Sequence, residues 1–178
     1  MRRYVRNRDG ATAIEFALVF TPFLALVFGI IGVSLFYFTE TILDQALNAA
    51  TRQIRTGQNH ATPSGELTVG KLKTQICDRS AGLIKCDKLT VVISNKAAWS
   101  DFTSLPSCTD ANSTVVPSNY QDSDSVATGA GGRERVVLVL ACYPWELLAS
   151  VPYIGLGNVN GGSSQLIQAL AAFKSEPY

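Results

Sequence analysis

Four cysteines carry the most reactive side chains of this chain, and all of them follow residue 76: Cys77, Cys86, Cys108 and Cys142. Thiols can form disulfide bonds, bind metal ions or attack substrates as thiolates. An even number of cysteines in an exported domain predicts two disulfide bonds, and four cysteines allow three pairings. The alternative is four buried free thiols. Which of the two holds depends on the side of a membrane on which these residues lie.

Catalytic motifs are missing from the sequence. Its single histidine, His60, has no second histidine with which to form a metal site or a catalytic triad. There is no GxSxG elbow, P-loop or HExxH motif. The pair Gly155 and Gly157 suggests a nucleotide-binding loop, but Asn160 stands where that motif needs its third glycine. We therefore expect no enzymatic activity, no metal and no cofactor.

Glu15 stands at the border of a long apolar stretch. The 24 residues from Phe16 to Thr39 contain no charged side chain. A helix of this length rises about 36 Å, and a hydrocarbon core is about 30 Å thick. The stretch therefore predicts a membrane-spanning helix. A core helix of a soluble protein is rarely apolar on all sides over such a length, and a cleaved secretory signal has a shorter apolar region.

Charge is distributed unevenly around this stretch. Residues 1–10 carry four arginines against one aspartate, and the rest of the chain has 11 basic and 13 acidic residues. The positive-inside rule then places the N-terminus in the cytoplasm and residues 40–178 on the far side of the membrane. The cysteines fall on that far side, which favours disulfides. A chain without a basic face is not expected to bind nucleic acid.

A short sequence, Gly10-Ala11-Thr12-Ala13-Ile14-Glu15-Phe16, joins the basic segment to the apolar stretch. It resembles the processing site of type IV pilin-like proteins, in which a prepilin peptidase cuts after the glycine and leaves the apolar helix attached. An acidic residue at the fifth position after the cut, followed by an aromatic residue, resembles the Tad (Flp) branch. RDGATAIEFALVFTPFLALVFGI is similar to the N-terminus of TadE-type pseudopilins, and RVVLVLACYPW and AAFKSEPY are similar to their C-terminal parts.

The resemblance implies a processing site at Gly10 and Ala11 and an assembly role for Glu15 and Phe16. A carboxylate costs about 2.5–3.5 kcal/mol at the middle of a membrane helix and less near its end. Cleavage would create an α-amine on Ala11, one helical turn before Glu15, and this amine could neutralise Glu15 in the same chain or in a neighbouring subunit. The alternative is a first-turn acid stabilised by the helix dipole, worth less than about 1 kcal/mol.

The helix is predicted to continue beyond the membrane. Apolar residues recur at helical spacing from Ile42 to Ile54, and Gly57 is a natural stop. One helix from about Ala11 to Thr56 follows, with a kink at Pro22. Gly29 and Gly32 offer a narrow face for another helix, or are incidental.

The exported domain, residues 57–178, is predicted to be α+β, with a small antiparallel sheet against the distal half of the long helix. The polar residues 58–66 form a linker, 67–80 a short helix, and 88–94, 135–143 and 163–173 strands. Residues 163–173 fit a helix equally well, and the family resemblance favours the strand. Cys77 and Cys86 then lie close enough to join the helix to the first strand, and Cys142 could tether Cys108. These are the preferred pairs.

Two irregular segments remain. Residues 95–132 are a long polar loop region whose first part we expect Trp99, Phe102 and Cys108 to anchor. Residues 144–162 are apolar but interrupted by prolines and glycines, and form either a packed loop over the core or an apolar patch facing the membrane or another subunit.

Together these features predict a structural or assembly component of a Tad-type pilus, a minor pilin or pseudopilin. As the resemblance implies, it would span the bacterial inner membrane once, with its C-terminal domain in the periplasm, and either enter the extracellular pilus or only prime its assembly. Its partners would be the prepilin peptidase, other pilin-like subunits and the Tad secretion machinery. The alternatives are an unprocessed membrane-anchored envelope binding or assembly factor and a secreted enzyme that has lost residues 1–39.

Overall fold

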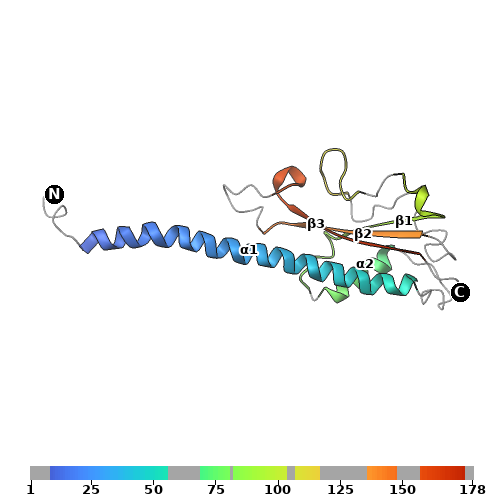
Figure 1. Cartoon of the computed structure of the whole chain (residues 1–178), viewed down its shortest axis with the longest axis horizontal. Helices are drawn as coiled ribbons and strands as arrows, with labels where there is room; N and C mark the ends of the chain where they lie inside the picture. Colours follow the sequence, from blue (N-terminus) through green and yellow to red (C-terminus); the bar gives the residue numbers. More distant parts are fainter. Residues whose placement is uncertain are drawn as a thin grey trace. The chain divides into compact units, whose positions relative to one another are not determined.

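The computed structural model describes residues 9–55, 69–80, 82–103, 107–116, 136–147 and 157–174. The fold is α+β, as predicted (Figure 1). The chain divides into two compact units, residues 1–37 and 38–178. The elements in chain order are α1 (Asp9–Arg55), α2 (Val69–Arg79), β1 (Thr90–Lys96), the short 3-10 helix η3 (Trp99–Asp101), β2 (Val136–Trp145), the 3-10 helix η4 (Asn160–Gly162) and β3 (Gln165–Lys174).

Helix α1 is a single 47-residue α-helix that continues through Pro22. Its bounds differ from the predicted ones by two residues at the start and one at the end. Residues 40–55 repeat apolar side chains at helical spacing, which buries one stripe of the helix. The predicted stop at Gly57 and the predicted linker, residues 58–66, lie outside the described residues.

The sheet has three antiparallel strands in the order β1-β2-β3. Val139 of β2 is in register with Ile93 of β1 on one side and with Ala171 of β3 on the other. All ten residues of β2 are buried, as expected of a central strand that is apolar on both faces. In β3, buried and exposed residues alternate, so this strand buries one face only.

One face of the sheet packs against helices. The last turns of α1 and the whole of α2 lie on this side (Figure 1). The fully buried side chains Leu43 and Leu47 come from α1, and Leu72 and Ile76 come from α2. Ile93 and Val139, which are paired across β1 and β2, are fully buried as well. The distal part of α1 therefore stabilises the domain through burial of its apolar stripe.

The opposite face is covered by the loop of residues 107–116. Cys108 is buried with Val92, Leu140 and Cys142. The Thr90 hydroxyl donates a hydrogen bond to the Val116 carbonyl at 3.0 Å, and the Val116 amide donates to the Cys108 carbonyl at 2.9 Å. The first bond attaches Val116 to β1, and the second joins the two ends of this loop to each other.

A second loop, residues 157–164, holds the tip of the first one. The Asn160 amide donates to the Ser113 carbonyl at 3.0 Å, and the Asn160 Oδ1 accepts from the Val115 amide at 3.1 Å. Both Ser113 and Asn160 have a positive φ, 58° and 52°. Such angles are uncommon outside glycine, although asparagine tolerates them. Two loops far apart in sequence are thus locked together on the outer face.

The disulfides join the pairs that the sequence favoured. Cys77 in α2 is bonded to Cys86, just before β1, and Cys108 is bonded to Cys142 in β2, with a Cα–Cα distance of 5.8 Å in each pair. The first bond joins α2 to the first strand. The second joins the covering loop to the central strand.

Three of the expected irregular features are wrong. The residues that open the predicted loop, Asn95 and Lys96, belong to β1. Trp99 does not anchor the loop, since 56 % of its surface is exposed and its ring contacts Phe102 instead, with centroids 6.4 Å apart. Pro144 and Trp145 are buried at the end of β2 and belong to no loop or surface patch. Strand pairing with β3 extends β2 beyond Tyr143, the point where the following proline suggested an end.

Replacement of Gly157 by alanine is expected to destabilise the domain by about 1–3 kcal/mol. A Cβ atom on Gly157 would collide with the backbone of Gly162, which cannot move aside as a flexible side chain could. Chemical denaturation followed by the fluorescence of the buried Trp145 measures the change. Gly29→Ala is the matched control, because a Cβ there would meet nothing within 4 Å. Equal midpoints for the two variants would contradict the expectation.

Candidate processing and assembly segment

The predicted processing site lies at the very start of α1. The helix begins at Asp9, so the peptide bond between Gly10 and Ala11 belongs to its first turn. Residues four apart in a helix lie on the same face. The backbone nitrogen of residue 11 therefore lies one turn before Glu15, as the neutralisation of this carboxylate by a new α-amine requires.

The apolar stretch that follows is exposed. Within α1, Thr12–Arg52 is long and apolar enough to cross a membrane, and no other helix among the described residues is. Only 6 % of its most apolar window is buried, whereas a core helix of a soluble protein buries its apolar surface. Phe16, Leu18 and Val19 are 65 %, 71 % and 72 % exposed. An apolar surface this large needs lipid or the helices of other subunits to cover it.

Polar groups inside the stretch are satisfied by the helix itself. The Thr21 hydroxyl donates to the Ala17 carbonyl at 2.7 Å, and the Ser34 hydroxyl donates to the Ile30 carbonyl at 2.8 Å. Internal pairing of this kind is what a hydrocarbon environment requires, because lipid tails offer no hydrogen bonds. Both hydroxyls are therefore compatible with a membrane-spanning helix.

Aromatic rings lie at both ends of the stretch. The rings of Phe16 and Phe20 stack with centroids 4.9 Å apart, shortly after the predicted cut. Near the other end, Phe36 and Tyr37 make an edge contact at 5.6 Å. Tyrosine is enriched at membrane–water interfaces, so the position of Tyr37, three residues before Glu40, fits the far end of a candidate span. Sequence reasoning missed this residue, although its type and position were a sufficient signal.

The remaining chemistry-bearing residues do not join this segment. The cysteines belong to the disulfides described above, and His60 lies outside the described residues. Across the part of the chain that the structure describes, no three histidine, cysteine, aspartate or glutamate side chains gather in a way that could hold a metal ion.

Two lysines of the domain have shifted pKa values. Lys88 donates to the Glu146 carboxylate, which raises the pKa of Lys88 and joins the residues preceding β1 to those following β2. Partial burial lowers the pKa of Lys73, and the nearby charge of Asp87 opposes this effect. The Lys88 pair is exposed and stabilises the domain little.

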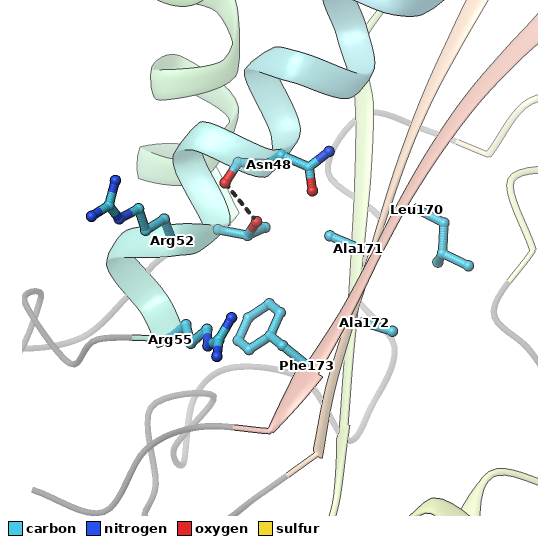
Figure 2. A pocket seen from close by; sticks show the side chains of 8 residues that line it. Asn48, Arg52, Arg55, Leu170, Ala171, Ala172 and Phe173 are labelled. Carbon is cyan, nitrogen blue, oxygen red and sulfur yellow. Dashed lines mark hydrogen bonds between the residues drawn. The ribbon is translucent and has the colours of Figure 1, made fainter.

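Sequence reasoning also missed a cleft between the end of α1 and β3. Its walls include Arg52 and Arg55 from α1 and residues 170–173 from β3 (Figure 2). The two arginines are visible in the sequence as an ordinary basic helix end. Only the fold brings them next to a strand.

Comparison with known proteins bears on the N-terminal part of the chain. Residues 10–52 match the family model described as TadE-like protein. No curated protein matches the chain, and no solved structure does. The matched residues begin at the predicted processing glycine and end in the part of α1 that packs against the sheet. Residues 10–52 thus form a TadE-like segment, which confirms the resemblance at the N-terminal end and points to a component associated with the Tad pilus.

Proposed function

We propose that the chain is a structural subunit of a Tad-type pilus, a minor pilin or pseudopilin that a prepilin peptidase cuts after Gly10. One observation carries the proposal: in a TadE-like segment, a glycine in the first turn of α1 precedes an acidic residue and an exposed apolar helix. This arrangement suits a subunit that waits in the inner membrane and then packs laterally against other apolar helices. The protein is a substrate of a peptidase and needs no catalytic site of its own.

The N-terminus of the mature protein tests the proposal. Intact mass and N-terminal sequencing of the membrane-extracted protein should give Ala11 as the first residue. Met1 as the first residue would favour the rival function, an unprocessed membrane-anchored binding or assembly factor. A start after Thr39 would mean that the apolar helix itself is removed, and both readings would then fail.

Glu15→Gln is expected to abolish or strongly reduce pilus assembly while processing continues. The variant keeps the size of the side chain and removes the charge that the α-amine of residue 11 would neutralise. Electron microscopy and sheared-pilus blots measure assembly, and intact mass measures processing. Glu40→Gln, beyond the other end of the span, is the matched control and should assemble normally. Normal piliation of the Glu15 variant would contradict the assembly role and mean that this carboxylate only interacts favourably with the helix dipole.

A further inference from the structure

The two disulfide bonds of the domain differ in exposure. Cys108 and Cys142 are fully buried, where the loop of residues 107–116 covers the sheet. Cys86 is exposed, and Cys77 is half-buried in the last turn of α2. A thiolate breaks a disulfide by attack on one of its sulfur atoms, so the rate depends on access to that atom. The first bond is therefore shielded until the domain opens locally, whereas the second is open to an external thiol.

The surface around the exposed bond is accessible as well. Lys85 and Asp87, on either side of Cys86, are both exposed. In the same connection between α2 and β1, a Cβ atom on Gly82 would meet nothing within 4 Å, so the space beside this turn is open. The described residues around the bond therefore leave room for a second protein to approach.

Exposure also predicts which sulfur atom is attacked. The exposed Cys86 should take the incoming thiolate, and the half-buried Cys77 should leave. Lys73 lies one helical turn before Cys77 on the same face of α2, and the charge of Asp87 acts on it, which places Lys73 near the segment that contains Cys86. A positive charge here stabilises a thiolate on Cys77 and offsets the unfavourable C-terminal end of the helix dipole.

The exposed bond fixes the end of α2. The buried residues of this helix all precede Cys77: Val69, Leu72 and Ile76. Arg79, its last residue, lines a groove of about 400 Å³ whose other wall consists of α1 residues between 42 and 49. Reduction of the bond would leave the buried residues in the core, while the last turn of α2 loses its covalent link to the segment before β1.

We propose that Cys77–Cys86 is a thiol–disulfide exchange site of the folded protein, and that its partner is a dithiol protein, an oxidoreductase with two neighbouring cysteines. Reduction by this partner releases the last turn of α2, and oxidation fixes it again. The Cys108–Cys142 bond remains intact and keeps the sheet and its covering loop together. The inference does not depend on processing at Gly10.

The exchange has two balanced steps. One thiolate of the partner bonds to the Cys86 sulfur, the Cys77–Cys86 bond breaks, and its electron pair leaves on the Cys77 sulfur, which takes up a proton. The second thiolate of the partner then attacks the partner's own sulfur in the mixed disulfide and releases Cys86, which takes up a proton as well. The partner ends as a disulfide and this protein as two thiols. An oxidised partner runs the same steps in reverse.

Reduction of the full-length protein in a nonionic detergent tests the difference in access. The probes are dithiothreitol and reduced thioredoxin, and free thiols are alkylated at intervals and assigned by peptide mass spectrometry. The exposed pair should be alkylated at least about 100-fold faster than Cys108 and Cys142, because reduction of the buried pair first requires local unfolding. The fluorescence of Trp145 should show that the domain stays folded meanwhile. Equal rates for the two bonds, or no reduction of the exposed bond by thioredoxin, would overturn the proposal.

Reduced glutathione tests the direction of attack. It is a monothiol, so its first product is a mixed disulfide, which acid quenching preserves for peptide mapping. The adduct is expected on Cys86, with a free thiol on Cys77. An adduct mainly on Cys77 would show that the assigned direction is wrong.

Hydrogen exchange tests the consequence for α2. After reduction, the amides of residues 76–79 should exchange at least about tenfold faster, while the amides of β2 stay protected over the same period. The double variant C77A/C86A is the matched control: its α2 should exchange like that of the reduced wild type and should not respond to dithiothreitol. Unchanged exchange at residues 76–79 after reduction would mean that the bond does not control the end of this helix.

Discussion

Gly10→Val is expected to leave residues 1–10 attached to the protein and to abolish pilus assembly. A peptidase that cuts after glycine leaves no room for a branched side chain at that position, so the reaction should stop before the bond breaks. Gly10 lies at the first turn of α1, away from the buried core residues that begin at Leu43. The C-terminal domain should therefore fold as before. Intact mass of the membrane fraction measures the outcome directly, because the uncut form is heavier by the mass of residues 1–10.

Two controls make this result specific. Gly29→Ala changes a glycine in the same helix where a Cβ meets nothing within 4 Å, and it should be processed normally. Both disulfides should still form in Gly10→Val, which shows that the domain reached its folded state. If Gly10→Val were shortened to Ala11 like the wild type, the processing assignment would be wrong.

Loss of the Cys108–Cys142 bond is expected to destabilise the domain by roughly 4 kcal/mol, and loss of the Cys77–Cys86 bond by roughly 2.5 kcal/mol. The reason is loop length: the first bond closes a separation of 34 residues and the second a separation of 9. A longer closed loop removes more conformational freedom from the unfolded chain. The double variants C108A/C142A and C77A/C86A, unfolded in guanidinium and followed by Trp145 fluorescence, measure the difference. Both values are large fractions of the stability of an ordinary domain.

Burial of the sulfur atoms also predicts a larger loss of stability for C108A/C142A than for C77A/C86A. Cys108 and Cys142 are fully buried beside Val92 and Leu140, whereas Cys86 is exposed. Truncation of the two buried sulfur atoms leaves space in the core, and truncation of an exposed one does not. The reduced wild-type protein lacks both bonds and is the control. It should be at least as unstable as the less stable of the two double variants. An equal loss in both variants, or a larger one for C77A/C86A, would contradict the expectation.

The periodicity of apolar residues in the sequence was sufficient to predict most of the helices and strands. The apolar stretch and its continuation to Ile54 predicted α1 to within two residues, because helical spacing is a local signal. The apolar, β-branched sequence of residues 135–143 predicted the central strand. For residues 163–173, periodicity alone could not distinguish a helix from a strand. Their pattern fits a helix as well as a strand, and the structure shows that they form β3, which pairs with β2.

What the sequence could not predict depends on contacts between distant residues. Trp99 looked like an anchor because large aromatic rings are usually buried, yet its side chain is exposed, and Cys108 is the loop residue that is buried against the sheet. The cleft combines Arg55 of α1 with Phe173 of β3, and no local pattern links the two. The lock between Ser113 and Asn160 is similarly invisible, since it rests on backbone angles that neither residue type dictates.

The hydrogen bonds of Val116 have a consequence for insertions into the domain. Val116 is attached to Thr90 and Cys108, and β2 begins at Val136. The chain between these two points is therefore held at both ends by the sheet, whatever its own length. Lengthening such a connection costs little, about 0.6 kcal/mol for each doubling. An insertion between residues 117 and 135 is therefore expected to leave the fold of the domain intact.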